Sequence, residues 1–134
     1  MSWADWLKKP FAALAGADEA RWVVLDVETS GLDPQRDQLL AIAAIAVQVD
    51  WTARRLSIMP GDSFEVVLRQ SSVGSSKDNI LLHGIGLQRQ SEGVPPDQAL
   101  RAFADFIGDS PLLAFHAPFD QAMIGRHVVQ HLGA

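Results

Sequence analysis

Two acidic residues stand at the end of an apolar segment, where a charged pair is unusual. Asp26 and Glu28 lie two positions apart, directly after Trp22-Val23-Val24-Leu25. In an extended strand, residues i and i+2 project from the same face, so the two carboxylates lie side by side. Such a pair repels and is costly to desolvate unless a cation lies between its members. The spacing therefore indicates a divalent-metal site, and it equally fits a strand that simply reaches the surface here.

A third acid, Asp120, lies in the first turn of a predicted helix that begins at Pro118. Acids are favoured there by the helix dipole, by ~0.3–1 kcal/mol, so Asp120 taken alone is best explained as a helix-terminal charge. If the strand before it is a neighbour of the first strand, Asp120 comes close to the acidic pair. Three carboxylates suit Mg²⁺ or Mn²⁺ rather than zinc.

The segments that must position these acids predict an α/β fold with a mixed sheet. Arg21–Val27 is expected to be a central strand covered on both faces, because its apolar residues do not alternate with polar ones. Gln38–Arg69 fits a hairpin better than a helix. The later strand of that hairpin is expected in two halves, Arg54–Ile58 and Phe64–Arg69. Helices are expected over Ser2–Gly16, Asn79–Ile85, Pro95–Gly108 and Pro118–Gly133. A second buried strand is expected over Pro111–Phe115.

Composition limits the classes of function that remain. The chain has 134 residues, a formal net charge of −5, 48% hydrophobic residues and no cysteine, which predicts one packed domain and excludes a disulfide scaffold, a thiolate zinc site and a cysteine nucleophile. The longest apolar run, Leu39–Val47, is far short of the ~20 residues that span a bilayer. The N-terminus is a poor signal peptide, because Asp5 lies in the region that should be positive, so a cytoplasmic protein is expected.

Three segments resemble the DnaQ-like 3′–5′ exonucleases, the family of the DNA polymerase III epsilon subunit. Residues 25–34 (LDVETSGLDP) are similar to the first motif, D-x-E-T-T/S-G, His83-Gly84-Ile85 to an H-G-I segment, and residues 114–120 (AFHAPFD) to A-H-N-A-x-F-D. The resemblance runs from about Arg21 to His131. It implies a ribonuclease H-like three-layer α/β fold, in which three antiparallel strands precede a parallel one.

The resemblance also implies a function and its residues. Asp26, Glu28 and Asp120 would hold two Mg²⁺ or Mn²⁺ ions, ~3.5–4 Å apart, that clamp a phosphodiester at a 3′ end of DNA or RNA. Thr29 would contact the terminal nucleotide, and Leu32 would support the terminal bases. The implied partners are a single-stranded 3′ end and a polymerase subunit, with no membrane. Two bound ions would change the formal charge from −5 to −1 (−5 + 4).

The sequence also departs from the family pattern. Phe115 and His116 stand where the family usually has His and Asn, and Gly86 replaces a common Thr. No H-x-x-x-x-D motif follows, so its general base and fourth metal carboxylate are missing from these 134 residues. We therefore expect an N-terminal helical extension over residues 1–20 and an exonuclease domain over residues 21–134 that is incomplete at its C-terminus.

Two other functions stay open at this stage. A non-catalytic nucleic-acid-binding module is expected if the chain truly ends at Ala134, since general-base catalysis is typically worth ~10²–10⁴-fold. An aspartyl phosphotransferase would use Asp26 as nucleophile, but Glu28 and Lys77 are poor matches for its other groups. His127 and His131 have a metal-ligand spacing, yet without an H-E-x-x-H pattern they are better explained as residues near a helix end.

Overall fold

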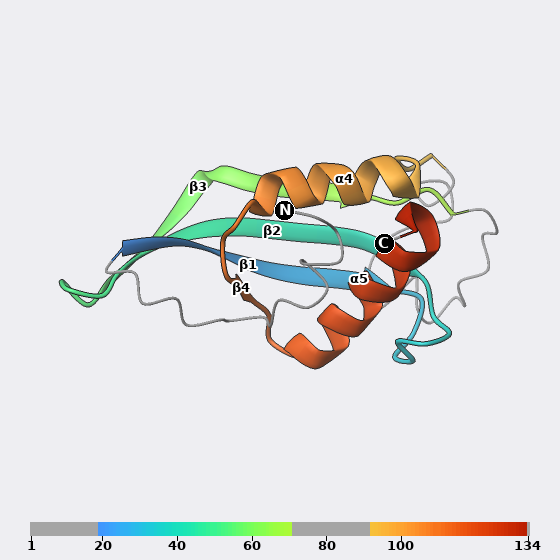
Figure 1. Ribbon diagram of the computed structural model, residues 1–134, viewed down its shortest axis with the longest axis horizontal. Helices are drawn as coiled ribbons and strands as arrows, with labels where there is room; N and C mark the ends of the chain where they lie inside the picture. The colour runs from blue at the N-terminus through green and yellow to red at the C-terminus, as the bar shows by residue number, and fades with distance from the viewer. Residues whose placement is uncertain (1–18, 71–91, 134) are drawn as a thin grey trace.

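The computed structural model describes residues 19–70 and 92–133. The helices expected over Ser2–Gly16 and Asn79–Ile85 lie outside the described residues. Within them, the elements are β1 (Glu19–Thr29), β2 (Leu39–Asp50), β3 (Arg55–Val67), α4 (Pro96–Ile107), β4 (Leu112–Leu113) and α5 (Ala117–Leu132) (Figure 1).

The sheet is mixed, with the strand order β3-β2-β1-β4. β1 and β3 each pair antiparallel with β2, and β4 pairs parallel with β1 through Val23↔Leu112 and Val24↔Leu113. The predicted α/β fold with three antiparallel strands followed by a parallel strand is therefore confirmed. β1 is central because it is held by a long ladder on one side and by the short β4 on the other.

β3 is one strand with an irregularity rather than two separate halves. The register shifts where Met59 faces Ala46 and Ser63 faces Ile45, so residues 60–62 are extra on the β3 side. A proline and a glycine in this short segment disfavour a regular ladder, and a bulge accommodates both. The bulge is tied to β1, because the guanidinium of Arg21 donates two hydrogen bonds to the Asp62 carboxylate, at 2.7 Å and 3.1 Å.

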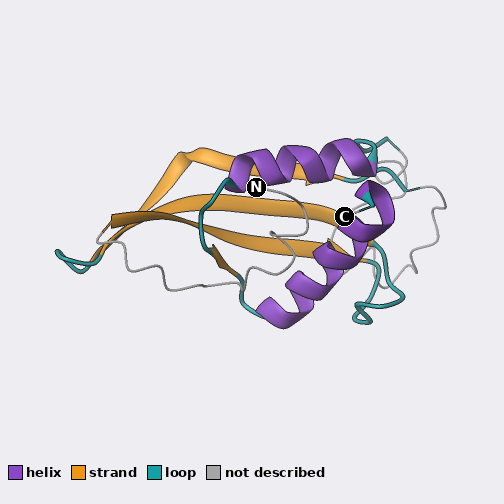
Figure 2. Ribbon diagram, in the orientation of Figure 1, coloured by secondary structure: helices purple, strands orange, loops and turns teal. Residues whose placement is uncertain are grey.

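Both described helices pack on one face of the sheet, so the described residues supply the sheet and one helical layer (Figure 2). Alternation along β1 directs Val23, Leu25 and Val27 into this core. The helical side of the core comes from the apolar stripes of α4 and α5. Its buried members are Ala99, Leu100, Phe103 and Ile107 on α4, and Met123, Ile124 and Val128 on α5.

The opposite face of β1 is less covered than the sequence suggested. Val24 is 38% exposed and Asp26 is exposed, so the prediction of a strand buried on both faces is wrong at these positions. Trp22 on the same face is buried and contacts Trp51 edge-on, with ring centroids 6.3 Å apart. None of the helices in the described ranges is long and apolar enough to span a bilayer.

Two boundaries near the last strand differ from expectation. β4 is only Leu112–Leu113, not Pro111–Phe115, because the chain turns outward at once and leaves Phe115 fully exposed. The carbonyl of Pro111 still accepts a hydrogen bond from the Val23 N–H, at 2.9 Å. α5 begins at Ala117, so Pro118 is its second residue rather than its first. The predicted ends of both helices, Gly108 and Gly133, are confirmed as their C-caps.

Candidate active site

The three predicted metal-binding acids come from the end of β1 and the start of α5. Asp26 and Glu28 lie in the last four residues of β1, on the face of the strand that the helices leave open. Asp120 lies in the first turn of α5 and is buried. A hollow of about 440 Å³ borders Asp26, with walls from β1, β2 and β3.

The carboxylate of Asp120 accepts a hydrogen bond from the backbone N–H of Val27. This contact follows from the shortness of β4. The Val23 N–H points toward the chain before β4, and by alternation the Val27 N–H points to the same side, beyond the last paired residue Val24. Asp120 thus satisfies a strand donor that β4 does not reach, and the contact fixes the start of α5 beside the acidic pair.

Electrostatic repulsion connects the three acids through Asp26. Burial and, secondarily, the charge of Asp26 raise the pKa of Asp120 from 3.8 to about 6. Its own N–H, the Val27 N–H and the nearby His116 partly offset that rise. Burial, followed by the same Asp26 charge, also raises the pKa of Glu28. The structure therefore brings Asp26 close to both other acids.

The donor set fits a hard divalent cation, although its side chains do not form a closed cluster. Across residues 19–70 and 92–133, no three Asp, Glu or His side chains lie close enough together to hold a metal ion by themselves. Oxygen-only ligands and mutual repulsion are nevertheless what Mg²⁺ and Mn²⁺ sites share. The assignment of Asp26, Glu28 and Asp120 as metal ligands stays a prediction.

The two predicted nucleotide contacts lie just after β1. Thr29 is its last residue, and its hydroxyl donates a 2.6 Å hydrogen bond to the Gly31 carbonyl. Leu32 is 85% exposed, which is unusual for a leucine in an otherwise well-bonded turn. Residues 29–38, here named the Leu32 loop, carry this side chain four positions after Glu28 in the sequence.

The first sequence motif lies at the end of β1, and the buried Asp120 lies in the first turn of α5. A family model described as exonuclease (RNase_T) matches residues 23–133 of this chain. The chain belongs to this exonuclease family. The matched range includes all of the described elements except the first four residues of β1.

Curated relatives of this exonuclease chain include replicative polymerases. The PolC-type DNA polymerase III of Thermotoga maritima is 29% identical over 115 residues, which are 86% of this chain and 8% of that protein. The PolC-type enzyme of Streptococcus pyogenes serotype M2 is 30% identical over 115 residues, covering 84% of this chain and 7% of its own length. The exonuclease chain thus spans less than a tenth of these relatives.

Solved structures agree with the family at the level of the fold. The zinc-bound form of an E. coli exonuclease I–single-stranded DNA complex superposes with a TM-score of 0.68, covering 84% of this chain and 24% of that one. Sequence identity in this comparison is 15%. The likeness confirms the ribonuclease H-like fold expected from the sequence.

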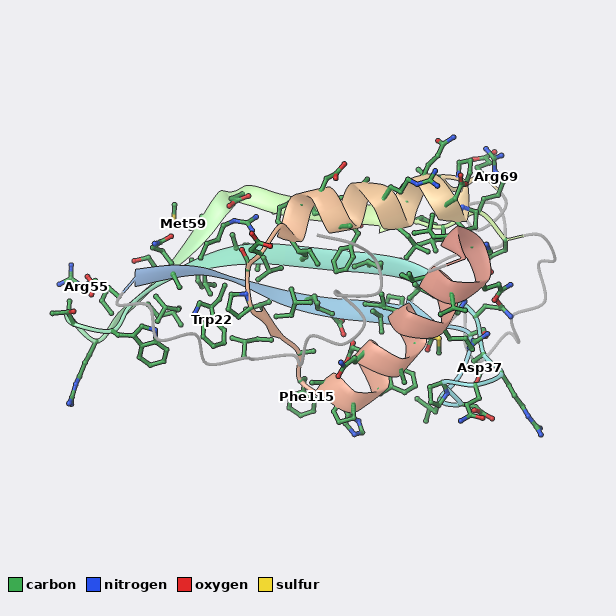
Figure 3. The ribbon with its side chains drawn as sticks, in the orientation of Figure 1. Trp22, Asp37, Arg55, Met59, Arg69 and Phe115 are labelled. Atoms are coloured by element: carbon green, nitrogen blue, oxygen red, sulfur yellow. The ribbon has the colours of Figure 1, made fainter. Side chains whose placement is uncertain are left out.

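Two further residues organise the Leu32 loop of this exonuclease chain, and sequence inspection missed both. The Asp37 carboxylate accepts hydrogen bonds from the Ser30 hydroxyl and the Asp33 N–H. Arg126 on α5 donates to the carbonyls of Pro34 and Asp37. Figure 3 shows Asp37 in the loop at the end of the sheet near α5, with Trp22 and Arg55 toward the other end. No local pattern marks Arg126, because its acceptors lie about 90 residues earlier.

His127 is a buried link between α5 and β2. Its Nδ1 is 2.8 Å from the Met123 carbonyl, to which it donates, and its Nε2 accepts from the Leu39 N–H at 3.1 Å. Both bonds require the neutral ring with the proton on Nδ1. Burial lowers the pKa of His127 to about 4, and the charges of Arg126 and His131 add to this effect. His127 is therefore a buried packing and hydrogen-bonding residue, whereas the sequence suggested only a histidine favoured near a helix end.

Proposed function

We propose that this chain carries a 3′–5′ exonuclease domain that removes terminal nucleotides from a single-stranded 3′ end, using two Mg²⁺ or Mn²⁺ ions. The observation that carries the proposal is the position of Asp26, whose charge acts on both Glu28 and Asp120 at the carboxyl end of β1. Open α/β sheets bind their ligands at that end. A divalent cation would remove the repulsion that the three carboxylates otherwise bear.

The proposal assigns a role to each predicted site residue. Asp26, Glu28 and Asp120 hold the ions, which when bound activate the attacking water and stabilise the leaving 3′ oxygen. Thr29 and the backbone after it contact the terminal nucleotide, and Leu32 supports its base. Because Asp120 is fixed by the Val27 N–H, α5 keeps one ligand in place before any ion arrives.

The identity of the relatives supports a proposal for the nucleic-acid substrate and for the cellular process. The curated relatives are DNA polymerases, and the solved neighbour was crystallised with single-stranded DNA. We therefore propose DNA as the substrate, a polymerase as the associated activity, and action in replication or repair in the cytoplasm. RNA trimming is the alternative within the class, and it is distinguished by contacts around the 2′ position.

The test is degradation of 5′-labelled single-stranded DNA and RNA by the purified chain, with Mg²⁺, with Mn²⁺ and with EDTA. We expect shortening from the 3′ end that needs the divalent ion and is lost in Asp26→Ala. Asp105→Ala is the matched control, because Asp105 is an exposed carboxylate on α4, an element that carries none of the three candidate ligands. Activity that survives EDTA, or that is equal in Asp26→Ala, overturns the site assignment.

A non-catalytic binding module is the second candidate, and one observation favours it. Within the part of the chain that the structure describes, no three Asp, Glu or His side chains lie close enough together to hold a metal ion by themselves. This alternative predicts that Mn²⁺ and an oligonucleotide bind but that no nucleotide is released. Isothermal titration with Mn²⁺, run beside the degradation assay, separates the two functions.

A further inference from the structure

The Leu32 loop is held from inside by one carboxylate. Asp37 Oδ1 accepts from the Ser30 hydroxyl at 3.2 Å, and Oδ2 accepts from the Asp33 N–H at 2.8 Å. The Asp37 N–H in turn donates to the Asp33 carbonyl at 2.8 Å. Leu32 lies between the residues bonded in this way, so its backbone is fixed while its side chain stays in solvent.

The same carboxylate explains why position 31 is glycine. A Cβ added to Gly31 would lie 2.6–2.7 Å from Cγ and Oδ1 of Asp37, closer than real side-chain contacts allow. The absence of a side chain lets the carboxylate approach the turn and reach its two donors. Glycine is needed here because the Asp37 carboxylate comes close to its Cα, and not because of an unusual backbone angle, since Gly31 is not among the positive-φ residues.

The loop is held from outside by α5. Arg126 Nε donates to the Pro34 carbonyl at 2.8 Å, and an Nη of the same guanidinium donates to the Asp37 carbonyl. Arg126 is partly buried and also contacts Met123 Sδ at 3.7 Å. Two of its guanidinium nitrogens are therefore directed at protein carbonyls of the loop.

Arg126 and Asp120 share one helix. They are six residues apart on α5, so their Cα atoms are separated by about 9 Å along its axis. One rigid element thus fixes a proposed metal ligand and the loop that carries Leu32. We infer that Asp37 and Arg126 are positioning residues that set the location of Leu32, and with it the terminal base, relative to the three carboxylates. This inference rests on the proposed function.

The inference is tested by binding of a 5′-fluorescein single-stranded oligonucleotide to the full chain in EDTA, measured by fluorescence anisotropy. Arg126→Met is compared with Arg36→Met, which removes the same charge from an exposed arginine of the loop. We expect Arg126→Met to weaken binding about tenfold, in line with the loss of charge-assisted hydrogen bonds, and Arg36→Met to change it less than about twofold.

A double-mutant cycle with Leu32→Ala separates positioning from a general loss of structure. If Arg126 acts through Leu32, the Arg126→Met effect falls to less than about twofold in the Leu32→Ala background. Gly31→Ala is a second route to the same result, because it disturbs the loop without touching α5. Melting temperatures are recorded for every variant.

Three results have distinct meanings. A wild-type chain that neither binds nor shortens the oligonucleotide overturns the proposed function. A wild type that binds, with Arg126→Met equal to Arg36→Met, overturns only the positioning role. An Arg126→Met effect that is unchanged in the Leu32→Ala background likewise overturns it, because a merely structural arginine acts independently of Leu32.

Discussion

Asp120 accepts a hydrogen bond from the backbone N–H of Val27, and so a side chain of α5 completes the hydrogen bonding of β1. This contact holds the Asp120 carboxylate beside the end of β1. The location has an energetic cost, because burial and the charge of Asp26 both disfavour its ionised form. In the proposed function, a cation bound by Asp120 would offset this cost.

Asp120→Asn is expected to stabilise the metal-free chain at pH 7 while abolishing divalent-dependent degradation. The folded-state pKa is raised from 3.8 to about 6, so ionised Asp120 costs about 1–3 kcal/mol of unfolding free energy at pH 7. The amide keeps an oxygen for the Val27 N–H and carries no charge. Urea unfolding in EDTA measures the gain.

The pH dependence of that gain is a check on its cause. Well below pH 3.8 the carboxyl is protonated in both the folded and the unfolded state, so the advantage of Asp120→Asn should shrink as the pH falls from 6 toward 3.8. An advantage that persists at pH 3.5 would show that packing, not charge, is responsible.

His127 is expected to make the fold acid-sensitive in a defined window. Its folded-state pKa is lowered to about 4, whereas the unfolded side chain titrates near 6.5, so its contribution is complete above pH 6.5 and is lost as the pH falls toward 4. His127→Gln should therefore flatten the dependence of unfolding free energy on pH by about 1–3 kcal/mol across that window.

The wild type is the reference for this comparison, because the charge of His116, the exposed histidine on α5's N-cap, acts on Asp120 in the same pH window. Urea unfolding at half-unit pH steps gives the curves to compare. Asp120 acts in the opposite direction between pH 4 and 6, so the difference between variant and wild type is the informative quantity. Parallel curves for wild type and His127→Gln would contradict the prediction.

Divalent ions are expected to stabilise the chain through the acids. A ligand that binds only the folded state adds RT ln(1 + [L]/Kd), about 2.7 kcal/mol at one hundred times Kd. Mn²⁺ should raise the melting temperature of the wild type and of Asp105→Ala but not of Asp26→Ala. Equal shifts in all three would place the bound ions elsewhere.

Arg21 is expected to matter more to stability than its ion-pair partner Asp62. Besides the bidentate contact, Arg21 donates to the Ser110 hydroxyl at 2.8 Å and lies 4.8 Å from the centre of the Phe106 ring. Arg21→Met should thus lower the melting temperature more than Asp62→Asn does. The hydrogen bond from Arg21 lowers the Asp62 pKa, so the Asp62→Asn effect should disappear as the pH falls below about 4.

Several helices and strands could be predicted from local sequence patterns. The apolar stripe and Gly108 predict α4, and the acidic pair after Trp22–Leu25 marks the end of β1. Local patterns were less reliable where tertiary contacts decide. Pro60 and Gly61 suggested a break in β3, but the pairing of Met59 and Ser63 with β2 makes them a bulge within one strand.

The candidate site was accessible only in part. Asp26, Glu28 and Asp120 have a recognisable spacing, and their proximity follows from the topology. The residues that hold the loop have no such signal. Arg126 and His127 look like an ordinary helix sequence, and their partners, the Pro34 carbonyl and the Leu39 N–H, are backbone groups about 90 residues away. Every residue type has a backbone carbonyl, and all but proline have a backbone N–H, so the sequence does not show which of them will be a hydrogen-bond partner.

The two-residue strand β4 has a consequence for how the molecule folds. Its pairing of Val23 with Leu112 joins positions 89 residues apart, whereas β1, β2 and β3 are joined by short hairpin connections. Closing so long a loop is slow, because its entropy is lost before any contact is gained. We expect the antiparallel meander to form first and α5 to dock last, which pulsed amide exchange would detect as late protection of Val27. The acids are thus assembled only at the final folding step, and a growing chain carries no complete site.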